Sequence, residues 1–217
     1  MELADKLIGF VITIEISLVQ PLNFLSIDSR EAANDPEFIK YIRDADALFI
    51  ARGAQNTYED YWEGTAVEDT IDFLINQRKV PVAGTSTGMA ILVDYYYLPS
   101  HQGVQSSEIL NDPFHHKTKD IYRSDFIKVP FLKNFIIDTH LARINRNHPE
   151  TRYGRITGLM ARLVHDTNRF SVFAIGLEEG TFLAIGEEGI AKVFGNGEAK
   201  GQDAYFLQIN GVQPEQI

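Results

Sequence analysis

The sequence predicts an α/β protein with a mostly parallel sheet covered on both faces. Short apolar runs, such as 47–51 and 80–83, alternate along the chain with segments that have a helical pattern. The apolar runs themselves show no alternation of polar and apolar residues. Strands of this kind are typical of parallel sheets that are buried on both faces. The 217 residues are 44% hydrophobic and 23% charged, which suits one α/β domain with a substantial core. We therefore expect residues 1–217 to form a single domain without an internal linker or repeat.

The N-terminal half supplies most of the predicted elements. Short strands are expected over 7–14 and 22–27, followed by a helix over 32–43. Asn34 or Asp35 would cap this helix, and Pro36 would lie in its first turn. After the buried strand 47–51, a second helix is expected from 60 to 77, then the buried strand 80–83 and a helix from 88 to 97.

The C-terminal half has a different pattern. The apolar run that begins at Phe135 ends in Asp138, Thr139 and His140, which predicts another strand with polar residues at its carboxyl end. Further along, three short strands are separated by Glu-Glu-Gly and Gly-Asn-Gly turns, and they predict a small antiparallel ribbon over 173–177, 181–185 and 190–194.

Composition excludes several classes of function. A formal net charge of −10 argues against a nucleic-acid-binding surface. The absence of cysteine excludes disulfides, thiolate catalysis and cysteine-ligated metals. No apolar run approaches the length of about 20 residues that a membrane helix needs. The start of the chain does not resemble a secretion signal, so the expected location is cytoplasmic as written, or secreted if a leader is missing.

One short motif suggests chemistry. Residues 80–92, VPVAGTSTGMAIL, place Ser86 between two glycines where a strand is expected to become a helix. This Gly-x-Ser-x-Gly pattern is that of a nucleophile elbow, in which the backbone N–H of the next residue, here Thr87, faces a developing oxyanion. A helix-entry turn with Ser86 as its N-cap explains the local pattern equally well.

His140 is the best candidate for the base that such a serine requires. It follows an apolar strand, whereas the other five histidines lie in polar or proline-bearing stretches. The sequence alone does not identify the acid that would orient His140. The carboxylates between Ser86 and His140 are Asp94, Glu108, Asp112, Asp120, Asp125 and Asp138. Basic residues cluster after His140 and could bind a substrate carboxylate; they are Arg143, Arg146, Arg152 and Arg155.

Several motifs, in the right order, resemble cyanophycinase-like serine peptidases, which are relatives of dipeptidase E. GTSTGMAI resembles the family's Gly-Thr-Ser-Ala-Gly-Met-Ala-Ile elbow, and DTHLARINR followed by RYGR resembles its Asp-(Thr/Gln)-His motif and arginine-rich segment. ARGAQ, followed by an aromatic pair, resembles its Gly-Gly-Asp-Gln loop. The resemblance implies a three-layer α/β sandwich similar to class I glutamine amidotransferases, with a serine in place of the cysteine.

The same resemblance implies a set of site residues. Ser86 would be the nucleophile, His140 the general base and Glu108, which matches best by its place in the chain, the triad acid. The backbone N–H groups of Gly53 and Thr87 would form the oxyanion hole. Substrate-binding residues would be Gln55, Asp138 and Arg155. The implied substrate is a peptide or isopeptide with an acidic residue near the cut, and no metal or organic cofactor is expected.

This chain departs from the family at three places. Arg52 and Ala54 replace a glycine and an aspartate of the family's loop, and Thr87 replaces an alanine. Residues 1–24 are expected to be a divergent or truncated N-terminal segment. An alternative is therefore a catalytically inactive relative that acts as a binding or scaffold protein. An α/β-hydrolase esterase is disfavoured because its histidine normally lies near the C-terminus. A homodimer is an option that the sequence leaves open.

Overall fold

The computed structural model describes residues 23–53, 55–99, 103–119, 121–123, 127–146, 149–169, 171–195 and 202–209. The strand expected over 7–14 lies outside these residues, as does nearly all of the segment 1–24. The strand expected over 22–27 is wrong for its described part, because residues 23–27 form no regular structure and Phe24 is 77% exposed.

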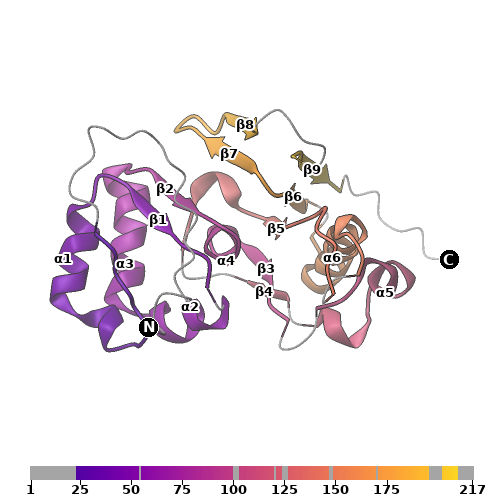
Figure 1. The fold of residues 1–217 in the computed structure, drawn as a ribbon, viewed down its shortest axis with the longest axis horizontal. Helices are drawn as coiled ribbons and strands as arrows, with labels where there is room; N and C mark the ends of the chain where they lie inside the picture. The colour runs from indigo at the N-terminus through magenta and orange to yellow at the C-terminus, as the bar shows by residue number, and fades with distance from the viewer. Residues whose placement is uncertain are drawn as a thin grey trace.

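A two-stranded parallel sheet forms one side of the molecule. Strand β1 (Leu48–Ile50) pairs with β2 (Val82–Gly84), so that Leu48 lies opposite Val82. Helices α1 (Pro36–Asp44) and α3 (Ala66–Phe73) lie together beside it (Figure 1). The predicted strands are present, but Phe49 is 48% exposed. The expectation that this strand is buried on both faces is therefore wrong.

The first helix begins where the sequence predicts. Asp35 accepts hydrogen bonds from the backbone N–H groups of Glu37 (2.7 Å) and Phe38 (3.4 Å), and Pro36 occupies the first helical position. The second predicted helix is interrupted. Its residues are divided among α2 (Gln55–Trp62), α3 and a π turn over Leu74–Arg78. The break falls at Gly64, whose φ of +67° does not continue a right-handed helix.

A five-stranded sheet forms the centre of the molecule (Figure 1). Its order is β4-β3-β5-β6-β9, and β3, β5 and β6 run parallel. The antiparallel strands β4 and β9 pair with β3 and β6 at the two edges of this sheet. The α/β class with parallel strands is confirmed. The strands are β3 (Tyr95–Tyr97), β4 (Ile121–Arg123), β5 (Phe135–Thr139), β6 (Phe173–Leu177) and β9 (Ala204–Gln208).

Both faces of the central sheet are covered. Tyr95 and Tyr97 point to the face that packs against α5 (Ser106–Asn111) and α6 (Tyr153–Thr167). Tyr96 points to the opposite face, which contacts the short helix α4 (Thr87–Ala90) and strand β7 (Thr181–Ile185). The helix predicted over 88–97 is thus wrong beyond Ala90, because the three tyrosines alternate between two cores as a strand. Short 3-10 turns complete the described structure, at Ala32–Asn34, His116–Thr118 and Pro130–Leu132.

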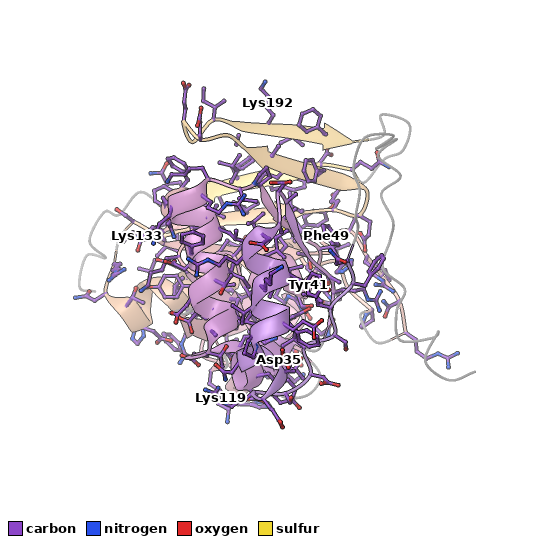
Figure 2. All side chains as sticks on the ribbon, turned by 90° about the vertical axis from the view of Figure 1, so that its left-hand side faces the viewer. Asp35, Tyr41, Phe49, Lys119, Lys133 and Lys192 are labelled. Carbon is purple, nitrogen blue, oxygen red and sulfur yellow. The ribbon has the colours of Figure 1, made fainter. Side chains whose placement is uncertain are left out.

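The predicted C-terminal ribbon is smaller than expected. Strand β7 (Thr181–Ile185) pairs antiparallel with β8 (Ala191–Gly195), and this hairpin carries Lys192 above the central sheet (Figure 2). The third expected strand, 173–177, is instead β6 of the central sheet, where it lies parallel to β5. In the part of the chain that the structure describes, no helix is long and apolar enough to cross a membrane.

Candidate active site

Ser86 lies on a tight turn between β2 and α4. Its backbone has φ +53° and ψ −117°, a conformation that non-glycine residues rarely adopt. The flanking glycines make this turn sterically feasible. A Cβ at Gly84 would lie 2.2 Å from the carbonyl oxygen of Gly88, and one at Gly88 would lie 2.3 Å from that of Ile50. The Gly-x-Ser-x-Gly spacing is therefore required by close backbone contacts as well as by the turn.

His140 comes directly after β5 and reaches Ser86. Its Nε2 is 3.2 Å from the Ser86 hydroxyl oxygen, and its Nδ1 is 2.9 Å from Oε1 of Glu179. This geometry fits a tautomer in which Nδ1–H donates to the Glu179 carboxylate and Nε2 accepts from the serine hydroxyl. The three side chains thus form a chain of contacts in the order of a nucleophile, a base and an orienting acid.

The parallel pairing of β5 with β6 explains why Glu179 reaches His140. Thr139 lies opposite Leu177 in the ladder, so the residues that follow the two strands emerge at the same edge of the sheet. The N–H of Leu141 donates to the carbonyl oxygen of Leu177 at 3.2 Å, which holds the two strand ends together. The sequence predicts only a turn at the Glu-Glu-Gly segment after β6, and its place at a strand end is the signal that could have pointed to Glu179.

Glu108, the acid implied by the family resemblance, is engaged elsewhere. It lies in the first turn of α5, where Oε2 accepts from the backbone N–H of Gln105 (2.8 Å) and Oε1 from Nζ of Lys117 (2.7 Å). The helix start uses this carboxylate as a capping group. In the structure, Glu179 therefore takes the position beside His140 that the sequence analysis expected for Glu108.

The electrostatic surroundings favour a neutral His140. Burial lowers the pKa of the imidazole, and although the hydrogen bond and charge of Glu179 raise it, the nearby cations Arg152 and Arg143 lower it further. The net direction is a pKa below the ordinary value of 6.5. At neutral pH the ring is thus available to accept a proton.

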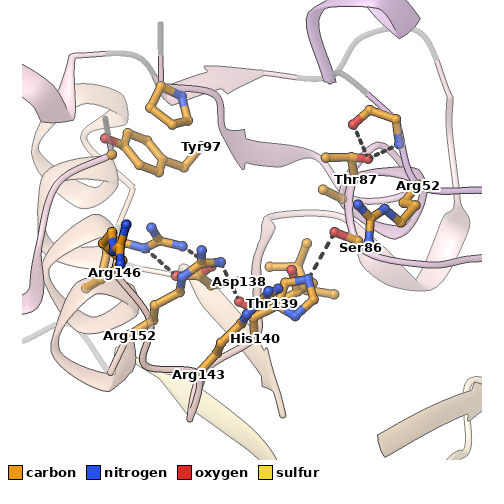
Figure 3. Close-up of a pocket in the computed structure, with 16 residues that line it drawn as sticks. Arg52, Ser86, Thr87, Tyr97, Asp138, Thr139, His140, Arg143, Arg146 and Arg152 are labelled. Carbon is orange, nitrogen blue, oxygen red and sulfur yellow. Dashed lines mark hydrogen bonds and ion pairs between the residues drawn. The ribbon is translucent and has the colours of Figure 1, made fainter. Parts of the chain in front are cut away.

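Ser86 and His140 open into a pocket of about 720 Å³ (Figure 3). Five arginines line this pocket, whereas Asp138 is the single carboxylate among the lining residues. A protein with a net charge of −10 therefore concentrates positive charge at this site. The lining arginines are Arg52, Arg143, Arg146, Arg152 and Arg155.

Two of the predicted substrate-binding residues are bound to each other. Nε and Nη2 of Arg155 lie 2.7 and 2.5 Å from the two carboxylate oxygens of Asp138, and both side chains are only 7% exposed. Arg152 lies 3.8 Å from the same carboxylate and donates through Nη1 to the carbonyl oxygen of Thr139 at 2.8 Å. Burial and the charge of Arg155 lower the pKa of Arg152 to about 10. Its Nε is buried and has no hydrogen-bond partner among the described residues.

The predicted oxyanion-hole residues also contact each other. The N–H of Gly53 donates to the hydroxyl oxygen of Thr87 at 2.8 Å. The same hydroxyl donates to the carbonyl oxygen of Gly53 at 2.9 Å. One predicted oxyanion donor is thus already paired. Gln55 begins α2, but its side chain lies outside the described part of the structure. No group of three potential metal ligands occurs among the described residues.

The fold is similar to that of a solved structure described as a peptidase from an acI-B1 Actinobacterium. The match covers 87% of this chain and 67% of that chain, with a TM-score of 0.51 and 17% sequence identity. No family model matches the sequence, and no curated protein matches it. At this identity the likeness shows a shared α/β fold.

Proposed function

We propose that this chain is a serine-type hydrolase that cleaves peptide or isopeptide bonds through an acyl-enzyme, as cyanophycinase-like peptidases do. The observation that carries the proposal is the contact series Ser86–His140–Glu179 on a strained elbow at the edge of a cationic pocket. The likeness of the fold to that of a peptidase supports it. The arginine-lined wall supports a substrate with an acidic residue, such as an aspartyl residue, near the cut.

The arrangement of these groups defines the steps. The Ser86 hydroxyl attacks the substrate carbonyl while His140 Nε2 accepts its proton, and Glu179 stabilises the imidazolium through Nδ1–H. The imidazolium then donates this proton to the leaving amine, so that the C–N bond breaks and an acyl-Ser86 ester remains. A water molecule, deprotonated by His140, hydrolyses the ester. The N–H groups of Thr87 and Gly53 are the proposed donors to the oxyanion.

Hydrolysis of short aspartyl peptides tests the proposal. Purified wild-type chain is incubated with Asp-Leu, and release of free leucine is followed by chromatography. We expect turnover by the wild type and none by Ser86→Ala. Lys40→Gln, which removes an exposed charge on α1, serves as the matched control and is expected to retain full activity. Turnover by Ser86→Ala equal to that of the wild type would contradict the proposal.

The paired state of Gly53 favours a second candidate, an inactive relative that binds peptides without cleaving them. As long as its N–H donates to Thr87, it cannot also donate to an oxyanion. Rotation of the Thr87 side chain would release it. The loop would remain in place, because Tyr58 donates to the carbonyl oxygen of Ala51 (2.5 Å) and Thr85 N–H to that of Ile50 (3.1 Å).

Replacing Thr87 with alanine is therefore expected to raise the acylation rate. One competing hydrogen bond contributes about 1 kcal/mol, which corresponds to a rate increase of roughly 5-fold. Thr87→Ser, which keeps the hydroxyl, should behave like the wild type. Pre-steady-state labelling by a fluorophosphonate measures this rate. A slower reaction of Thr87→Ala would show that the hydroxyl positions the loop for catalysis rather than competing with the oxyanion.

The pH dependence of the reaction reports on His140. A base acts only when it is unprotonated, and the lowered pKa keeps it so at mildly acidic pH. We expect the acidic limb of kcat/KM to have its midpoint below pH 6.5. In Glu179→Gln the midpoint should move lower still, because both effects of Glu179 raise the pKa of His140. A midpoint that rises in this variant would contradict the assigned contact.

A further inference from the structure

Arg52 lies at the rim of the pocket on a well-anchored loop. Hydrogen bonds hold the backbone on both sides of it, from Tyr58 to the carbonyl oxygen of Ala51 and between Thr87 and Gly53. The side chain itself is exposed and lines the pocket, and its guanidinium has no hydrogen-bond or ion-pair partner in the described part of the chain. A fixed backbone therefore presents, next to Ser86, a cation that has no partner among the described residues.

The other pocket cations lie on the opposite wall. Figure 3 shows Arg52 beside Ser86 and Thr87, whereas Arg143 and Arg152 lie beyond His140. They come from the segment between β5 and α6, while Arg52 follows β1. Arg155 belongs to the second wall as well, but its charge is compensated by the bidentate contact with Asp138.

Carboxylates among the described residues balance the charges of Arg143 and Arg152 only in part. Arg152 is largely buried, its Nε has no partner among the described residues, and its pKa is lowered by burial and by Arg155. Arg143 is exposed and likewise has no ion-pair partner within the described residues. An anionic group bound here would offset the desolvation and mutual repulsion of these cations.

We infer that the pocket has two anion subsites, one on each side of the bond that Ser86 attacks. Arg52 binds one anionic group of the substrate, and Arg143 with Arg152 binds the other. The substrate class is therefore a short peptide or isopeptide that carries a carboxylate on both sides of the scissile bond. This inference rests on the proposed function, since it takes Ser86 as the point at which the substrate is cut.

Guanidinium groups suit this task because their planar donors match the two oxygens of a carboxylate. Contacts with cations on both sides of Ser86 would also fix the position of the scissile carbonyl, because a substrate that is held at two points has little freedom to move. A peptide with only one carboxylate would lose one of the two contacts. Because Arg52 is exposed and screened by water, we expect its carboxylate contact to change affinity by about 10-fold, near the lower end for charged hydrogen bonds.

Three dipeptides test the two subsites: Asp-Leu with both carboxylates, Asp-Leu amide without the C-terminal one, and Asn-Leu without the side-chain one. Calorimetry measures their binding to the Ser86→Ala variant, which removes turnover, alone and combined with Arg52→Gln or Arg143→Gln. Lys40→Gln is again the charge-matched control away from the pocket.

We expect the three peptides to bind selectively. Asp-Leu should bind about 10-fold more tightly than either peptide with a single carboxylate. Arg52→Gln should abolish the preference for one of the two carboxylates, and Arg143→Gln should weaken the preference for the other. Lys40→Gln should leave all three affinities unchanged. Three results would overturn the inference. Arg52→Gln could weaken the binding of all three peptides equally, it could leave their binding unchanged, or none of the peptides could bind.

The same peptides separate this inference from the proposed function. If the Ser86→Ala protein shows the selective pattern but the wild type does not cleave Asp-Leu, the two subsites stand and the hydrolase assignment fails. If the wild type cleaves all three peptides with the same kcat/KM and Arg52→Gln does not change these values, the hydrolase assignment stands and the two-subsite inference fails.

Discussion

Replacing Glu179 with glutamine is expected to lower kcat by about 100-fold to 1000-fold. The neutral amide removes the charge that stabilises the His140 imidazolium, and its NH₂ group favours the tautomer in which Nδ1 accepts a hydrogen bond. Nε2 would then carry the proton and could not accept one from Ser86. Because Glu179 is 42% exposed, we expect a smaller effect than that of a fully buried acid, for which losses near 10⁴ are typical.

Glu108→Gln is the matched comparison, since the family resemblance implies this residue as the acid. A glutamine can retain the capping contact with Gln105, so α5 should still form. We expect its kcat for Asp-Leu hydrolysis to remain within about 2-fold of the wild type, as is usual for a change outside the catalytic groups. A severe loss in Glu108→Gln together with normal activity in Glu179→Gln would show that the contact in the structure is not the one used in catalysis.

Replacing Asp138 with alanine is expected to destabilise the fold by about 3 to 5 kcal/mol, because it leaves buried arginine charges without their partner. Arg155 is 7% and Arg152 15% exposed, so water can solvate neither of them fully. For a chain of this length, the loss corresponds to a fall in Tm of roughly 10 °C. Thermal unfolding followed by circular dichroism measures it.

Asp44→Ala provides the control for this stability prediction. Asp44 pairs with Lys40 at 3.5 Å on the surface of α1, where both side chains are largely exposed. Exposed pairs of this kind contribute little, so the Tm should remain close to that of the wild type. Equal Tm values for Asp138→Ala and the wild type would mean that the arginines find other partners, which would contradict the described arrangement of the pocket wall.

Local sequence rules predicted the parts of this structure that depend on neighbouring residues. The Gly-x-Ser-x-Gly turn forms because both glycines approach backbone atoms too closely for a side chain. Asp35 caps α1 through bonds that reach only two and three residues along the chain. The parallel strands β1, β2 and β5 were recognisable as short apolar runs, and His140 as the residue that follows one of them.

The parts that could not be predicted depend on contacts between distant segments. Periodicity alone does not distinguish a short buried strand from a buried helix, so Tyr95–Tyr97 were assigned to a helix. The contact of Glu179 with His140 depends on the neighbouring positions of β5 and β6, and the sequence alone does not show that these two strands are neighbours. The pairing of Asp138 with Arg155 likewise joins β5 to α6, a helix that the sequence analysis did not identify.

Covalent modification of Ser86 tests the central claim most directly. The folded wild type is treated with a fluorophosphonate at neutral pH, the intact mass is measured, and the adduct is located by mass spectrometry of proteolytic fragments. We predict one adduct per chain, on Ser86, that is absent in Ser86→Ala and forms far more slowly in His140→Ala. A folded wild type that gains no adduct, or an adduct on a different residue, would contradict the account.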